Sequence, residues 1–204
     1  MTVSTTTPGR YSLGLRALVL RVALFLLAVC ACSRARAADA RIVYYDITGN
    51  SASALRDQLD IKGPIGKTGE HVDAFTKWYV AWNYHYRPTP AGCRFTDMQV
   101  SVTGTILMPR WVYPSDVSRS LLRRWQDYLA ALLVHERGHY AHGESAAGAI
   151  TALENSFRDY SGNCQTMVQS FKDQAHAILA KYQAMDEAYD KATDHGRTQG
   201  ARFP

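Results

Sequence analysis

Residues 121–140, LLRRWQDYLAALLVHERGHY, decide how this chain folds. Apolar residues recur along them every three or four positions, the period of a helix with one buried face. This stripe consists of Leu121, Leu122, Trp125, Leu129 and Leu132. Ser115 or Asp116 is expected to cap the helix at its start. The helical pattern continues to about Phe157, with a bend expected at Gly143, so the fold is organised around one long helical segment.

The segments before this helix have the composition and the alternation of strands. Apolar and aromatic residues alternate with polar ones in two neighbouring segments, and a loop at 88–92 reverses the chain between them. Such a pair suits an antiparallel arrangement with one packed face. The predicted strands cover residues 41–48, 78–86 and 98–106, and a short helix capped by Ser51 covers 51–60.

A second long helix is predicted near the C-terminus. Its apolar stripe consists of Met167, Phe171, Ala175, Ile178 and Tyr182. Strands first and helices afterwards are typical of an α+β domain. The sequence therefore predicts an antiparallel or mixed sheet, then the long helix of 121–140, then further C-terminal helices.

The long helix contains the pattern His-Glu-x-x-His. One helical turn places His135 and His139 on the same face, with Cβ atoms about 5–6 Å apart. Two imidazoles at that spacing can bind one zinc ion at about 2.0–2.1 Å each. Glu136 lies one residue round the helix, where its carboxylate can take a proton from a water held by the metal. Because the preceding residues are apolar, the helix is expected to be buried, and two unpartnered imidazoles would be unfavourable there.

A third metal ligand has to come from elsewhere in the chain. His142 is about 10 Å along the helix axis from His135, so it is expected to be a solvated neighbour. Glu144 could turn inward after a bend, and Glu154 lies farther along. His195, followed by a glycine just past the end of the last helix, could fold back over the site. The residues alone leave these candidates open.

The first 37 residues have the composition of an export signal. None of them is acidic, and arginines precede an unbroken apolar run over Val22–Cys32. This run is shorter than the roughly 20 residues that a membrane-spanning helix needs. Ala35-Arg36-Ala37 has the small-residue pattern of a cleavage site. Residues 1–37 are therefore predicted to be a signal peptide, and residues 38–204 a single domain that is periplasmic or secreted.

Cleavage of the leader would leave a chain without net charge. The whole sequence has 23 basic and 18 acidic residues, and the leader contains Arg10, Arg16, Arg21, Arg34 and Arg36. A neutral domain lacks the basic surface that nucleic acid requires, so nucleic acid is not expected as a partner. A membrane would be a partner only through an uncleaved leader or through lipidation at Cys30 or Cys32.

Cys93 and Cys164 are the two cysteines that follow the leader. In an exported chain they are predicted to form one disulfide. The disulfide would close a loop of about 70 residues and add about 4 kcal/mol of stability in the chain-entropy model. The alternative is a pair of buried thiols, which fits a reducing cytosol better than an exported protein.

Five motifs in a fixed order resemble a known family. They are Tyr45-Asp46-Ile47-Thr48-Gly49 with Leu55, Gly63-Pro64, the aromatic segment Trp78–Tyr86, His135-Glu136-Arg137-Gly138-His139, and Tyr189-Asp190-x-x-Thr193-x-His195-Gly196. In these motifs the chain is similar to the DUF922 family of predicted secreted zinc-dependent proteases. The resemblance implies a zincin-like fold and favours His195 as the third zinc ligand.

The function expected from motif and resemblance is peptide hydrolysis by an exported zinc enzyme. Its substrate would be a peptide or protein of the cell envelope, with Glu136 as general base. Tyr189 is the candidate for stabilising the oxyanion, and Tyr140 is a weaker one. Two other hypotheses keep the metal: a non-catalytic envelope protein with a structural zinc ion, and a cell-wall amidase. A further hypothesis is a binding module without metal.

Overall fold

A three-stranded mixed sheet followed by two long helices forms the domain. The structure is a computed structural model that describes residues 40–67 and 69–203. The predicted α+β class is confirmed. The predicted leader, including Cys30 and Cys32, lies outside the described residues. Within those residues, no helix combines the length and the apolar character needed to span a membrane.

The sheet has the order β1–β3–β2, with β3 (Gly92–Trp111) in the centre. β1 (Arg41–Ile47) is parallel to β3, and β2 (Phe75–Thr89) is antiparallel to it. β2 and β3 form one long hairpin, in which half-buried residues alternate with exposed ones as predicted. A register shift between His85 and Tyr86 interrupts the alternation, and it leaves Tyr86 exposed.

The short helix α2 (Ala52–Lys62) packs its apolar side into the main core. The Oγ atom of Ser51 accepts a hydrogen bond from the backbone N of Ala54 at 3.2 Å, which confirms the predicted cap. Leu55 and Leu59 are fully buried. Their cluster extends across the sheet to α3 and includes Ile47, Ile106, Met108, Trp111, Leu121, Trp125, Tyr128 and Leu132.

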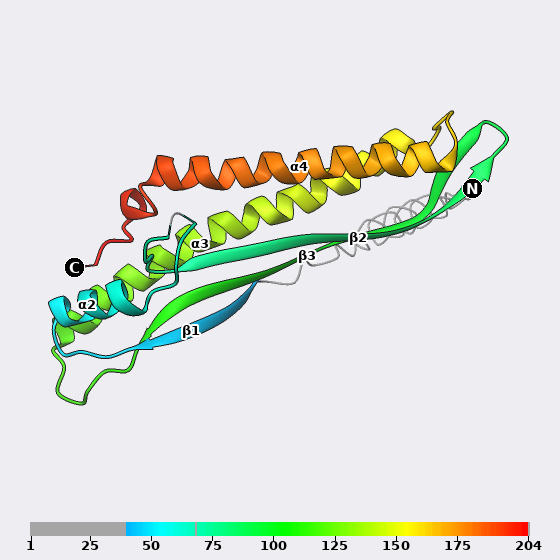
Figure 1. The fold of residues 1–204 in the computed structure, drawn as a ribbon. Coiled ribbons are helices and arrows are strands. Elements are labelled where there is room, and N and C mark those ends of the chain that lie inside the picture. Colours follow the sequence, from blue (N-terminus) through cyan, green and yellow to red (C-terminus); the bar gives the residue numbers. More distant parts are fainter. Residues whose placement is uncertain (1–39, 68, 204) are drawn as a thin grey trace, which may run out of the picture. The chain divides into compact units, whose positions relative to one another are not determined.

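The long helix α3 (Arg119–Glu154) lies along the sheet, and Figure 1 shows it in yellow-green. It begins later than predicted, because Ser118 rather than Ser115 or Asp116 accepts a hydrogen bond from the backbone N of Leu121 at 3.2 Å. The helix continues without a break through Gly143, the position of the predicted bend. A Cβ atom at Gly143 would lie 2.8 Å from Cγ of Trp78, so the glycine allows β2 to approach the helix closely.

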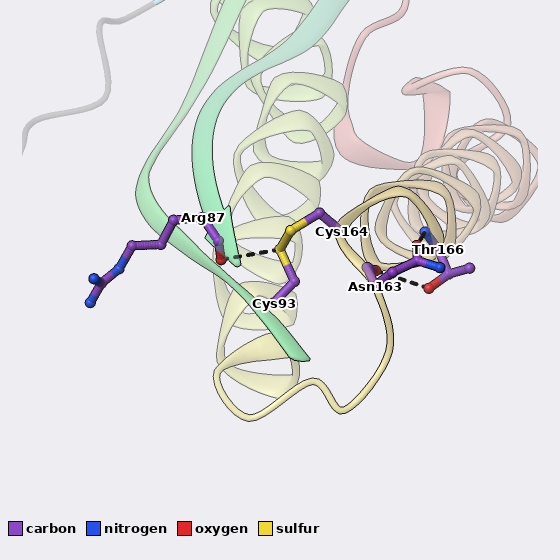
Figure 2. Close-up of a disulfide and its surroundings, with 5 residues drawn as sticks. All are labelled: Arg87, Cys93, Asn163, Cys164 and Thr166. Atoms are coloured by element: carbon purple, nitrogen blue, oxygen red, sulfur yellow. Dashed lines mark hydrogen bonds between the residues drawn. A yellow bond between two sulfur atoms is a disulfide. The ribbon is translucent and has the colours of Figure 1, made fainter. Parts of the chain in front are cut away.

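The last helix, α4 (Cys164–Thr193), runs back along α3, so the two helices are antiparallel (Figure 1). Its first turn is capped by Asn163, whose Oδ1 accepts a hydrogen bond from the backbone N of Thr166 at 2.9 Å (Figure 2). The antiparallel arrangement brings the C-terminal turns of α4 beside the middle of α3, which carries the His-Glu-x-x-His motif.

A disulfide joins Cys93 of β3 to Cys164, the first residue of α4, and thus confirms the predicted pair (Figure 2). The backbone N of Cys93 also donates a hydrogen bond to the carbonyl oxygen of Tyr160 at 3.0 Å. Close to the disulfide, Phe171 packs edge-on against aromatic rings of the hairpin, namely Trp82, Tyr84 and Phe95. The start of α4 is therefore fixed to the hairpin by a covalent bond and by packing.

A partly buried polar network around Asp73 ties the C-terminal tail to the core. Arg56 donates from Nη1 to Oδ2 of Asp73 at 2.9 Å, and it also donates to the carbonyl oxygen of Phe203 at 3.1 Å. The hydroxyl of Tyr128 donates to Oδ2 of Asp73, and that of Tyr45 donates to the Asp73 carbonyl, both at 2.7 Å. Burial, together with the charge of Asp73, raises the pKa of both tyrosines well above its ordinary value.

Candidate metal centre

Two imidazoles of α3 and one carboxylate of α4 meet between the helices. His135 is only 3% exposed, and its Nε2 atom lies 3.2 Å from Nε2 of His139. Oδ1 of Asp190 lies 3.2 Å from Nε2 of His135 and 2.9 Å from Nε2 of His139. Three atoms of the kind that bind divalent metals thus form a small triangle.

The triangle is close in size to the ligand set of a tetrahedral metal ion. Ligands bound at about 2.0–2.1 Å around a tetrahedral ion lie about 3.3–3.4 Å from one another. The observed separations of 2.9–3.2 Å are a few tenths of an ångström shorter. Two imidazole nitrogens and one carboxylate oxygen are also a ligand set found in catalytic zinc sites. The residues therefore fit a zinc ion both in geometry and in chemistry.

Hydrogen bonds on the far side of each imidazole favour metal binding through Nε2. Nδ1 of His135 lies 3.0 Å from Oε1 of Gln199, and Nδ1 of His139 lies 3.1 Å from Oδ1 of Asp186. Both partners are acceptors, so each Nδ1 carries the proton and donates it. A metal that displaces the proton held at Nε2 would then be bound through Nε2, which is the arrangement that surrounds metal-binding histidines.

Asp186 is itself held by three donors. In addition to His139, it accepts hydrogen bonds from Nε1 of Trp78 at 2.8 Å and from Nδ1 of His142 at 2.7 Å. His142 is therefore not the solvated neighbour that was predicted, since it is half-buried against this carboxylate. Its Nδ1 and that of His139 both lie within hydrogen-bond distance of Oδ1 of Asp186, so this carboxylate orients His139 and links it to His142.

The electrostatics of the site favour positive charge. Burial lowers the pKa of His139, but the hydrogen bonds to Asp186 and Asp190 outweigh this effect and raise that pKa to about 9. Burial raises the pKa of Asp190, but the hydrogen bonds with His135 and His139 outweigh it and hold that pKa far below its usual range. Without a metal the site retains a proton, and a divalent cation would replace that charge.

Glu136 lies on the inward side of α3 and is 4% exposed. Oγ1 of Thr76, in β2, donates to Oε2 of Glu136 at 2.6 Å and also contacts the Glu136 carbonyl at 3.1 Å. Burial raises the pKa of Glu136, while the Thr76 hydrogen bond and the two neighbouring histidines lower it by less. One oxygen of this carboxylate is therefore positioned by β2, and Oε1 has no hydrogen-bond partner among the described protein groups.

Tyr189 lies against the first histidine. Its ring stacks on that of His135 with a centroid distance of 4.9 Å and an interplanar angle of 12°. Its hydroxyl accepts a hydrogen bond from Nε2 of Gln199 at 2.9 Å. A Cβ atom at Gly138 would lie 2.6 Å from Cζ of Tyr189, so this glycine provides the space for the ring. These contacts position His135, whereas the predicted oxyanion role of Tyr189 stays a prediction.

His195 lies at the edge of the site. Its side chain is 65% exposed, and its Nδ1 atom lies 3.7 Å from Oδ1 of Asp190. The described residues form two groups with three ligand atoms within 4.8 Å of one another, and neither group contains His195, Glu144 or Glu154. The structure thus brings Asp190 to the two motif histidines and leaves His195 beside Asp190.

Comparison with protein families identifies the chain. A model described as a bacterial protein of unknown function, DUF922, matches residues 42–196. The chain belongs to the DUF922 family. All five motifs that carry the resemblance lie within the matched residues, so that resemblance is confirmed. The description of DUF922 assigns no activity, and comparison with curated proteins and with solved structures gives no match.

Sequence reasoning missed Asp186, Asp190 and Gln199. Asp186 and Asp190 are four residues apart on α4, the same spacing as the two histidines on α3. Two carboxylates at this spacing, close to a His-Glu-x-x-His motif in the fold, are a signal that could have found them. Gln199 follows α4 in an irregular tail, where no sequence pattern indicates its contact with His135.

Proposed function

We propose that this DUF922 protein is an exported zinc-dependent metallopeptidase with a zincin-like site, acting on peptides or proteins of the cell envelope. His135, His139 and Asp190 hold the zinc ion, and Glu136 is the general base. The triangle of Nε2 and Oδ1 atoms carries this proposal, because the other side of each imidazole is already bound to an acceptor. The disulfide supports a periplasmic or secreted location, since disulfides persist in oxidising compartments.

In the proposed hydrolysis, each of these residues has a distinct role. A bound zinc ion would polarise the scissile carbonyl and lower the pKa of a bound water to about 7. Glu136 takes the proton of that water at Oε1, because Oε2 accepts the hydrogen bond from Thr76. It then delivers the proton to the leaving amine. Asp186 and Gln199 hold the imidazoles in orientation through their Nδ1 atoms.

Experiments can distinguish the proposed peptidase from two alternative functions of the same centre. A non-catalytic protein with a structural zinc ion requires a closed site of four protein ligands, and Glu136 would have no task in it. A cell-wall amidase uses the same water activation on a different amide bond. Substitution of Glu136 tests the first alternative, and the choice of substrate tests the second.

The test compares the wild type with Glu136→Gln and Asp190→Ala, each purified from an oxidising compartment. Metal content is measured by mass spectrometry, and hydrolysis is measured on casein peptides and on peptidoglycan fragments. We expect one zinc ion per chain in the wild type and in Glu136→Gln, and loss of zinc in Asp190→Ala. Glu136→Gln should lower the hydrolysis rate by about 10²- to 10⁴-fold. A wild type that binds no zinc, or a Glu136→Gln variant with full activity, would contradict the proposal.

A further inference from the structure

We propose that His195 faces the substrate and donates a hydrogen bond to the oxyanion that forms on the scissile carbonyl. This inference rests on the proposed function and assigns a second catalytic residue to the same site. It also separates His195 from the zinc ligands, among which the resemblance had placed it.

The backbone holds His195 in an unusual conformation. Asp194 and His195 both have left-handed backbone angles, with φ of 49° and 51°. Side chains with a Cβ atom adopt this region at an energetic cost, and such residues cluster at functional sites. The turn is fixed by hydrogen bonds from the backbone N of His195 to the carbonyl of Asp190 at 2.9 Å, and from the backbone N of Gly196 to Oγ1 of Thr193 at 3.2 Å.

The side chain of His195 makes little packing contact that could offset the energy of its left-handed backbone conformation. With 65% of it exposed, the imidazole buries little apolar surface. Its one polar contact among the described residues is with Oδ1 of Asp190, at 3.7 Å. The fold therefore has no evident need for a histidine at this position, while the site has an imidazole N–H beside its carboxylate ligand.

The position of His195 suits contact with a substrate. The same Asp190 oxygen contacts Nε2 of both His135 and His139, so the His195 ring lies next to the ligand triangle. With 65% of its side chain exposed, the ring is accessible from solvent. Three protein ligands with one position left for water and substrate are typical of catalytic zinc sites, and an exposed imidazole next to one of the three ligands is close enough to that position to be proposed as a substrate contact.

In the hydrolysis step the water oxygen bonds to the carbonyl carbon, and the carbonyl π pair moves onto its oxygen. Glu136 takes the proton of the water. The imidazole N–H of His195 donates a hydrogen bond to the new oxyanion, a kind of contact that stabilises the transition state more than the substrate. When the carbon–nitrogen bond breaks, the oxygen pair re-forms the carbonyl and the Glu136 proton moves to the amine. Tyr189 suits this role less well, because its hydroxyl already donates a hydrogen bond to Oε1 of Gln199 at 3.2 Å.

His195→Asn is the informative variant, because asparagine adopts the left-handed conformation readily but cannot extend as far as an imidazole. His85→Asn is a matched control: His85 is also exposed, at 81%, and its Nδ1 lies 3.8 Å from a carboxylate oxygen of Asp97 in the hairpin. Three quantities are measured on each protein. They are zinc affinity in competition with a chelating dye, the visible spectrum of the cobalt(II)-substituted protein with and without acetohydroxamate, and kcat and KM on casein peptides.

We expect His195→Asn to bind zinc as tightly as the wild type and to keep the cobalt spectrum. Its affinity for acetohydroxamate should fall about tenfold, the effect of one charge-assisted hydrogen bond. Its kcat should fall about 10²- to 10³-fold with little change in KM, as for other oxyanion donors. His85→Asn should match the wild type in all three.

A weaker zinc affinity or an altered cobalt spectrum in His195→Asn would make His195 a ligand and overturn the inference. Unchanged acetohydroxamate binding and unchanged kcat would overturn it as well. Failure of the proposed function has a different signature, because the wild type itself would then bind no metal, or Glu136→Gln would retain full activity. Should casein peptides not be cleaved by a zinc-loaded wild type, acetohydroxamate binding alone decides the role of His195.

Discussion

Replacement of Gly138 by alanine tests whether Tyr189 holds His135 in place. In a helix interior this substitution normally stabilises a protein by about 0.5–1 kcal/mol. At position 138, however, the new Cβ atom would lie 2.6 Å from Cζ of Tyr189. The ring cannot retreat freely, because it stacks on His135 and its hydroxyl is bonded to Gln199.

Overpacking of this kind costs about 1–3 kcal/mol, which equals or exceeds the gain in helix propensity. We therefore expect Gly138→Ala to lie between neutral and about 2.5 kcal/mol less stable than the wild type. Because the displaced ring no longer supports His135, zinc affinity should fall by about 10- to 100-fold, as for other outer-shell changes.

The same helix offers a control in Gly148. A Cβ atom there would meet nothing within 4 Å, so Gly148→Ala should stabilise the protein by about 0.5–1 kcal/mol and leave zinc affinity unchanged. Both variants are compared with the wild type by urea unfolding of the metal-free protein and by zinc competition with a chelator. If Gly138→Ala is as stable as Gly148→Ala and binds zinc as tightly as the wild type, Tyr189 does not constrain His135 and the reasoning is refuted.

Three further predictions concern the disulfide, two tyrosines and one carboxylate. Replacing Cys93 and Cys164 by serine opens a loop with a sequence separation of 71 residues. The free energy of unfolding in urea should therefore fall by about 4 kcal/mol. A loss below about 1 kcal/mol would show that the unfolded chain is not restrained by the disulfide. Burial and a neighbouring carboxylate raise the pKa of Tyr45 and Tyr128, so above about pH 10 the unfolded chain releases protons that the folded protein keeps. The free energy of unfolding should then fall by about 1.4 kcal/mol per pH unit for each tyrosine, and Tyr128→Phe should halve this slope in urea titrations between pH 9 and 11. Asp186→Ala should weaken zinc binding by about 10- to 100-fold in chelator competition, and an unchanged affinity would show that this carboxylate does not orient its histidine.

Local patterns in the sequence were sufficient to predict most of the secondary structure. The alternation in the β2–β3 hairpin and the helical stripe of α3 both follow from side chains that face one core, and Ser51 caps α2 through a contact three residues away. The parallel pairing of β1 with β3 was not specified, because it depends on contacts between residues far apart in the sequence. The start of α3 differed by two or three residues, since several residues near it were able to cap.

The candidate site was predictable only where its residues share one helix. His135, Glu136 and His139 come from one turn of α3, so their spacing shows their common position. Asp190 reaches them only because α4 packs antiparallel to α3, and a carboxylate on a predicted helix suggests a solvated face as readily as a ligand. The tail motif contains both Asp190 and His195. For this reason it was interpreted as providing His195, the more common kind of zinc ligand, and not Asp190.

The way α4 is held has a consequence for how the family can vary. This helix is bonded to the hairpin through its first residue, Cys164, and near its other end Asp186 and Asp190 meet the imidazoles of α3. One inserted residue between these points would rotate the carboxylates by about 100° and shift them by about 1.5 Å, which would turn both away from the histidines. We therefore expect DUF922 proteins that share this disulfide to differ in the residues of this segment but to keep its length, without insertions or deletions.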